Sequence, residues 1–169
     1  MTPQKKRGNK IRRLVVQLEN DIKTSLNLAK EADEFAEKAN QFQAESKNPY
    51  IYAVAMTLQH FYTSLETAFK RVTKELEGDI PSGESWHRDL LELMFLEIEG
   101  VRPPLLSSAI KDDLDKLRRF RHVVRHGYEY ELDWSQMLPL IESLNKITKQ
   151  IKEDFAEFKS FLLEIIDDL

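Results

Sequence analysis

The sequence predicts an all-α fold, an up-and-down bundle of four long helices with one short helix that crosses them. Apolar residues recur at spacings of three and four along most of the chain, whereas no stretch alternates apolar and polar residues as a strand does. Glycine and proline fall in a few clusters that separate the periodic stretches. Long helices joined by such short connections are expected to pack as antiparallel neighbours.

The first two expected helices are long. One spans residues 11–46, and the alanines in its second half permit close packing by a neighbouring helix. The other spans residues 49–77. Pro49 suits the first turn of a helix, and Gly78 suits a left-handed cap at its end.

Three further helices are expected after the second. A short one at residues 85–98 ends before a cluster of glycine and proline, and it is too short to match the others, so it is expected to cross the bundle. The next occupies residues 107–125. The last is long and begins at Asp133, which with Gln136 has the spacing of a capping box.

The composition is that of a globular protein. Of 169 residues, 41% are hydrophobic and 32% are charged, and we expect one helical-bundle domain at residues 11–169 after a basic flexible arm at residues 1–10. No window approaches the roughly 18 apolar residues of a membrane-spanning helix, and the apolar run near the N-terminus is too short for a secretory signal. A cytoplasmic protein with no membrane partner is expected. The absence of cysteine excludes disulfides and thiol nucleophiles.

Charge is distributed unevenly along the chain. The net charge is −4, which taken alone argues against a nucleic-acid partner. However, residues 1–18 carry six basic and no acidic side chains, and residues 111–126 carry six basic and three acidic ones. Residues 129–169 carry four basic and ten acidic side chains. A basic strip therefore remains available for a polyanion on an otherwise acidic surface.

Most familiar catalytic motifs are missing. No His-Glu-x-x-His motif, glycine-rich phosphate loop or serine hydrolase motif occurs. His122 and His126 lie one helical turn apart, but the sequence offers no evident third metal ligand. We therefore expect neither a metal ion nor a cofactor.

The motif Arg-x4-His-x-Tyr stands at the end of the expected fourth helix, formed by Arg121, His126 and Tyr128. These residue types suit chemistry at a phosphate group, which needs a positive charge and a proton-transfer group. A histidine transfers protons near neutral pH, and an arginine binds two phosphate oxygens without losing its charge. Arg121 and His126 are therefore the candidate catalytic residues.

The spacing of Arg121 and His126 sets a geometric condition. On an ideal helix, residues five apart project about 140° apart, so the two side chains converge only if the helix loosens at His126, next to Gly127. One protomer then offers a single certain histidine for proton transfer. A two-fold dimer would supply a second histidine, or His122 could share the work within one protomer.

The motif resembles that of the HEPN superfamily, whose signature is Arg, a polar residue, a few mainly apolar residues and His. His122 occupies the polar position, Arg125 departs from the apolar spacer, and the extension to Tyr128 is similar to the HepT-type toxins. The start of the short helix, Ser85-Trp86-His87, is similar to HepT-like proteins more weakly. The resemblance implies a HEPN-like helical bundle.

The resemblance to HepT-type toxins also implies an activity and partners. It implies a metal-independent endoribonuclease, the toxin of a type VII-like toxin–antitoxin system, active as a homodimer whose two motifs face one cleft. It further implies a minimal nucleotidyltransferase antitoxin that adenylylates Tyr128.

Several other residues are candidates for supporting roles. His122, Arg125 and Glu66 are possible supporting residues, and Arg118 and Arg119 are candidates for RNA binding. We interpret His60 and His87 as structural, although His87 could reach an RNA groove. The following residues are therefore considered for the site: Arg118, Arg119, Arg121, His122, Arg125, His126, Tyr128 and Glu66.

Other interpretations of the basic cluster compete with the ribonuclease. Arginines in the last turns of a helix are favoured by the helix dipole, so the cluster could be purely structural. A second alternative is a non-catalytic module in which the arginines bind a nucleotide or a phosphorylated partner. A third is a coiled-coil-like scaffold that only oligomerises. The basic N-terminal residues could contact RNA, bind a partner or simply keep the end soluble.

Overall fold

A computed structural model describes residues 2–42, 49–126 and 132–169. Over these residues the fold is all-α with no strand, as the sequence predicts. None of these helices combines the length and the apolarity needed to cross a bilayer. The elements are α1 (Pro3–Gln41), α2 (Pro49–Val72), a π-helical turn (Thr73–Glu77), α3 (Trp86–Met94), a 3-10 turn (Ser108–Ile110), α4 (Lys111–His126) and α5 (Trp134–Asp167).

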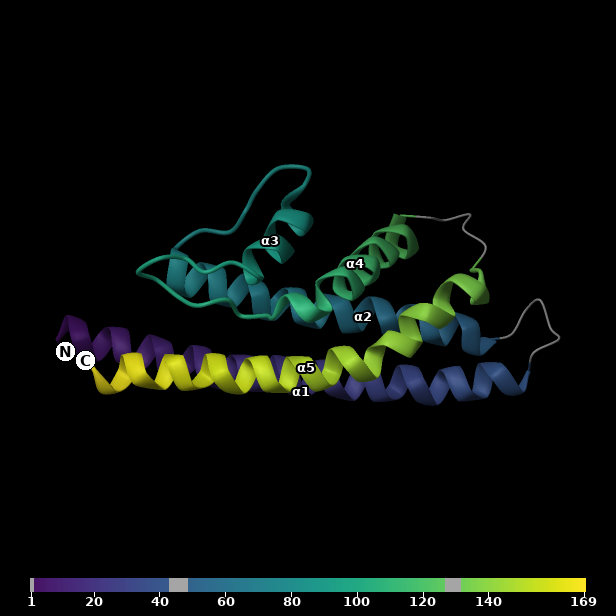
Figure 1. Ribbon diagram of the computed structural model, residues 1–169, viewed down its shortest axis with the longest axis horizontal. Helices are drawn as coiled ribbons and strands as arrows, with labels where there is room; N and C mark the ends of the chain where they lie inside the picture. The colour runs from purple at the N-terminus through teal and green to yellow at the C-terminus, as the bar shows by residue number, and fades with distance from the viewer. Residues whose placement is uncertain (1, 43–48, 127–131) are drawn as a thin grey trace.

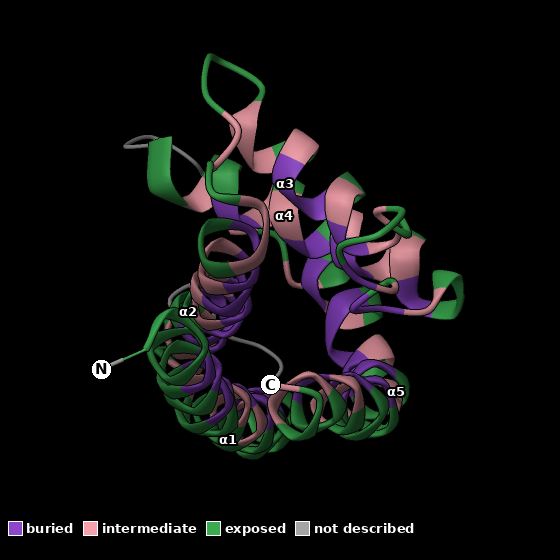
Figure 2. Cartoon of the chain, turned by 90° about the vertical axis from the view of Figure 1, so that its left-hand side faces the viewer, coloured by how far each residue is buried: buried purple, intermediate pink, exposed green. Residues whose placement is uncertain are grey.

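The helices form two groups, α1 with α5 and α3 with α4, and α2 lies between these groups (Figure 1). The long helices α1 and α5 lie side by side, and α2 packs along α1 (Figure 1). Both α3 and α4 pack on α2, across it from α1, and α4 also contacts α5. Seen along the bundle, the buried faces of the helices turn toward its interior (Figure 2). Because α2 contacts α1, α3 and α4, it is the helix on which the other parts of the fold are assembled.

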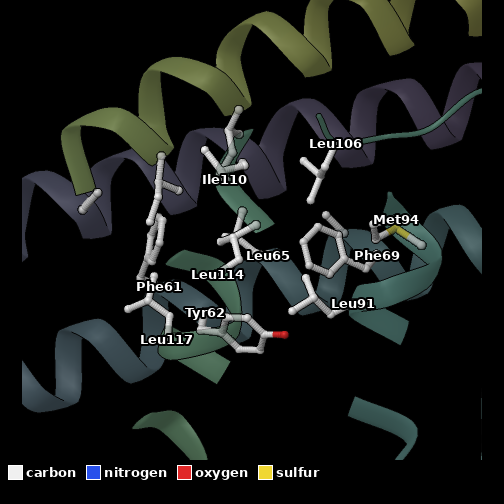
Figure 3. Close-up of a cluster of buried hydrophobic side chains, with 14 of the residues drawn as sticks. Phe61, Tyr62, Leu65, Phe69, Leu91, Met94, Leu106, Ile110, Leu114 and Leu117 are labelled. Atoms are coloured by element: carbon white, nitrogen blue, oxygen red, sulfur yellow. The ribbon is translucent and has the colours of Figure 1, made fainter. Parts of the chain in front are cut away.

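The core gathers on α2. Four large residues of this helix are at most 1% exposed, namely Phe61, Tyr62, Leu65 and Phe69. Side chains from α3, α4 and the segment between them close over these residues (Figure 3), namely Leu91, Met94, Leu106, Ile110, Leu114 and Leu117. Burial of this apolar surface is what fixes α3 and α4 against α2.

The first helix begins earlier than expected. We predicted a flexible arm at residues 1–10, but α1 starts at Pro3 and includes the rest of that segment. Thr2 caps it by accepting a hydrogen bond from the backbone N–H of Lys5 (3.3 Å), and proline suits the first helical position. Gly8 is buried, with Leu169 of the other terminus beside it. Residues 3–10 are therefore part of the first helix of the bundle, although their basic composition favours an arm.

The second helix ends as predicted, whereas the third is shorter. After the π-helical turn, Gly78 adopts a left-handed conformation (φ 92°) and its N–H bonds the carbonyl of Thr73 (3.1 Å). Helix α3 ends at Met94, four residues before the expected end at Ile98. There the chain turns back on itself, because Ile98 and Arg102 exchange backbone hydrogen bonds of 2.9 and 3.0 Å.

Arg102 holds this turn to the rest of the molecule. Its side chain is fully buried, and its Nε donates to Glu77 Oε1 (2.7 Å) at the end of the π-helical turn. Its two Nη groups donate to the backbone carbonyls of Leu93, Leu96 and Pro103 at 3.0–3.2 Å. One guanidinium therefore binds three carbonyls at and after the end of α3 and ties this segment to the π-helical turn that follows α2.

The two ends of the chain meet. Both termini lie at one end of the bundle, and the C-terminus of α4 lies toward the other (Figure 1). The basic start of α1 and the acidic end of α5 therefore run together, and Lys159 of α5 pairs with Glu19 of α1 at 2.5 Å. The N-terminal basic residues thus lie away from the motif at the end of α4.

Candidate active site

A pocket of about 350 Å³ lies between the start of α3 and the second half of α4. Two walls form it, because one group of lining residues comes from the loop and first turn at α3 and the other from α4. Three of the four histidines of the chain lie in these walls. The lining residues are Gly83, Glu84, Ser85, Trp86, His87, Arg118, Arg121, His122 and His126.

Arg121 is fixed against α2. It is 5% exposed, and an arginine is buried to this extent only when its guanidinium has partners. Its Nε donates to Thr63 Oγ1 (2.9 Å), and its Nη2 lies 3.5 Å from Glu66 Oε1. The guanidinium at the pocket wall therefore has its orientation set by two side chains of α2.

Glu66 is a buried carboxylate shared by several basic side chains. It is 2% exposed, which excludes the position on a solvated face that would have made it irrelevant to the motif. Besides Arg121, its carboxylate contacts His87 Nδ1 (2.5 Å) and Lys70 Nζ (3.8 Å). A carboxylate removed from water needs such partners, so Glu66 links α2 to both walls of the pocket.

His122 and His126 line the pocket from the last turns of α4. Their ring centroids lie 4.5 Å apart, and both residues are exposed. Helix α4 remains regular through His126, so the loosening expected there is not what brings Arg121 and His126 to one pocket. The pocket runs along the side of α4 from Arg118 to His126 and therefore reaches both side chains.

The remaining arginines differ in position. Arg118 lines the pocket, and its Nε donates to Asp115 Oδ1 (2.8 Å). Arg119 pairs with the other oxygen of Asp115 (3.1 Å) and keeps 63% of its side chain exposed outside the pocket lining. Arg125 is exposed and does not line the pocket. Tyr128 lies outside the residues that the structure describes.

Tyr62 lies close beneath the motif helix. It is fully buried, and its hydroxyl has no hydrogen-bond partner among the described residues. Burial, reinforced by the charge of Glu66, raises the pKa of the Tyr62 hydroxyl far above its usual value. The hydroxyl is therefore neutral, and Figure 3 shows it at the edge of the apolar cluster.

His87 and Thr63 are site residues that the sequence did not reveal. The sequence favours a structural role for His87 and leaves open that it reaches an RNA groove; the structure places it in the pocket lining and in contact with Glu66. The one available signal was the Ser85-Trp86-His87 segment at the start of the short helix. Thr63 carried no signal, because its role depends on how α4 lies across α2.

The described residues contain no cluster of three or more histidine, cysteine, aspartate or glutamate side chains suited to a metal ion. The chemistry of the pocket is instead that of imidazoles beside guanidinium groups. Such a set binds anions and transfers protons.

A family model described as HepT-like protein matches residues 53–162. The chain belongs to the HepT-like family. The match contains every residue that lines the pocket and nearly all of α2 and α5, whereas α1 precedes it. It confirms the resemblance that the Arg-x4-His-x-Tyr motif indicated and makes this HepT-like protein a member of the HEPN superfamily. No curated protein and no solved structure matches the chain.

Proposed function

We propose that this HepT-like protein is a metal-independent endoribonuclease, the toxin of a type VII-like toxin–antitoxin system. One observation carries the proposal: Arg121 and His126, a phosphate-binding cation and a proton-transfer group, line the same pocket. Arg118 and His122 add a second cation and a second imidazole to it.

In the proposed reaction, the 2′-hydroxyl of RNA attacks the adjacent phosphorus. The 2′-O–P bond forms, the P–O5′ bond breaks, and the products end in a 2′,3′-cyclic phosphate and a 5′-hydroxyl. Arg121 stabilises the charge that develops on the phosphorane oxygens. Because Thr63 and Glu66 already hold its guanidinium, little reorganisation is needed when RNA binds. His126 transfers a proton in this step.

The proposal includes the arrangement of partners. We expect a homodimer in which the pockets of the two protomers face one cleft. Arg118 and Arg119 then contact the phosphates of the RNA beside the cleaved bond, and Arg125, in the last turn of α4, is a possible supporting residue. A minimal nucleotidyltransferase is the expected antitoxin.

The direct test is to incubate the purified protein with RNA in EDTA. We expect cleavage to continue in EDTA and to leave 2′,3′-cyclic phosphate or 3′-phosphate ends, because no step requires a metal ion. Gel electrophoresis before and after treatment with a phosphatase identifies the ends. RNA binding without cleavage would instead favour a non-catalytic binding module, and no binding would favour a scaffold.

Adenylylation of Tyr128 is a separate expected result. Co-expression with a nucleotidyltransferase encoded beside this chain should raise the intact mass by one or more AMP units, because the motif places a tyrosine two residues after His126. A bulky anion there would oppose the approach of RNA phosphates. The Tyr128→Phe variant is the matched control and should keep its unmodified mass. An unchanged mass of the parent protein would contradict this part of the proposal.

A further inference from the structure

His87 occupies the wall of the pocket that the Arg-x4-His-x-Tyr motif does not supply. It lies in the first turn of α3, whereas Arg121, His122 and His126 lie on α4. Helices α3 and α4 lie on the same side of α2 (Figure 1). Imidazoles therefore stand at both walls of one pocket, with the guanidinium groups of Arg118 and Arg121 in its lining.

Glu66 determines which nitrogen of the His87 ring is left for a molecule in the pocket. An ionised carboxylate only accepts hydrogen bonds, so the 2.5 Å contact requires that Nδ1 of His87 carries a proton and donates it to Glu66 Oε2. Nε2 lies at the opposite edge of the ring and is the nitrogen left for a molecule in the pocket. A buried carboxylate that binds one nitrogen of an imidazole in this way fixes the orientation of the ring.

A stack on Trp86 holds the His87 ring in place. The His87 ring stacks on Trp86 with centroids 3.5 Å apart, and Lys70 Nζ lies 4.4 Å from the centre of the Trp86 ring. The His87 side chain is 25% exposed, so it is anchored inside the protein and still open to the pocket. A histidine that served packing alone would not need a hydrogen bond to a 2% exposed carboxylate.

We propose that His87 is the second proton-transfer residue of the pocket, so that one protomer holds both the acid and the base of RNA cleavage. This inference rests on the proposed ribonuclease function. His126 takes the proton of the 2′-hydroxyl as the 2′-O–P bond forms. His87 gives its Nε2 proton to the 5′-oxygen as the P–O5′ bond breaks. Glu66 holds the His87 ring through Nδ1, which leaves Nε2 as the ring nitrogen that faces the 5′-oxygen in this scheme, and Arg118 and Arg121 line the pocket beside the α4 histidines.

Two substrates separate a proton donor from a structural residue. A normal RNA linkage needs a proton on its leaving 5′-oxygen, whereas a nucleoside 3′-(4-nitrophenyl phosphate) releases a stable phenolate without one. We expect His87→Ala to slow RNA cleavage by about a hundredfold to ten-thousandfold and to leave cleavage of the nitrophenyl ester close to the wild-type rate. His126→Ala should slow both reactions.

Control variants keep the test independent of folding. His87→Gln retains an N–H for Glu66 and should show the same split between substrates. His60→Ala removes an exposed histidine of α2 that lies outside the pocket and should cleave both substrates normally. If His87→Gln cleaves RNA normally, or loses both reactions equally, the proposal is wrong while the ribonuclease stands. If the wild type cleaves neither substrate, both proposals are wrong.

Mixing inactive variants tests whether the pair belongs to one protomer. A mixture of His87→Ala and His126→Ala chains, unfolded together and refolded, should remain inactive on RNA because every pocket lacks one histidine. If His87 of one protomer worked with His126 of its partner, mixed dimers would contain one intact site. Recovery of about a quarter of the wild-type activity would then overturn the arrangement within one protomer.

Discussion

Arg121→Ala is expected to cleave RNA about a thousandfold more slowly than the wild type, since Arg121 is the buried cation of the pocket. His126→Ala should lose activity to a similar extent because it removes a proton-transfer group. Growth toxicity on induction should disappear with cleavage. Initial rates on a defined RNA, measured in EDTA, give the magnitudes.

Folding must be measured in the same variants, because Arg121 is a partner of Glu66. In Arg121→Ala the carboxylate keeps His87 and Lys70 as partners, so the helical circular dichroism spectrum should persist. Arg121→Lys retains a charge but loses the planar fork of donors, and its activity should remain low. Arg13→Ala on the exposed face of α1 is the matched control. Full activity in both Arg121→Ala and His126→Ala would contradict the ribonuclease assignment.

Arg102→Ala is expected to cause the largest loss of stability of any arginine substitution. It leaves Glu77 without its 2.7 Å partner and removes the donors to three backbone carbonyls. Breaking a buried ion pair from one side costs about 3–5 kcal/mol of the free energy of unfolding. Urea unfolding followed by circular dichroism measures the change.

A surface ion pair provides the comparison for Arg102. Lys111 and Glu92 pair at 2.6 Å, but their side chains are 40% and 48% exposed. Lys111→Ala should therefore change the free energy of unfolding by less than about 1 kcal/mol. A similar small change in Arg102→Ala would show that the turn after α3 does not depend on this guanidinium.

The sequence was sufficient for the helices because their signals are local. Periodic apolar residues and the clusters of glycine and proline identified the five α-helices of the described residues, and Gly78 ended the second one as expected. The end of α3 was missed because Arg102, eight residues later, determines it through tertiary contacts. The start of α1 differs from the expectation because a basic composition favours an arm, whereas the Thr2 cap and Pro3 in the first turn favour helix.

The candidate site was predictable only where its residues are close in the sequence. Arg121 and His126 belong to one motif, so the sequence alone assigns both residues to one candidate site. Glu66 and His87 are 21 residues apart on different helices, and their contact exists only because α3 packs on α2. Spacing within one helix carries no information about such a pair.

The pairing of α1 with α5 affects how the chain folds. Glu19 and Lys159 are separated by 140 residues, whereas α1 and α2 follow each other directly along the chain. Closing a long loop costs more conformational entropy than forming a helical hairpin, so docking of α5 on α1 is expected to follow the pairing of α1 with α2. The C-terminal helix would then be the last part of the bundle to dock.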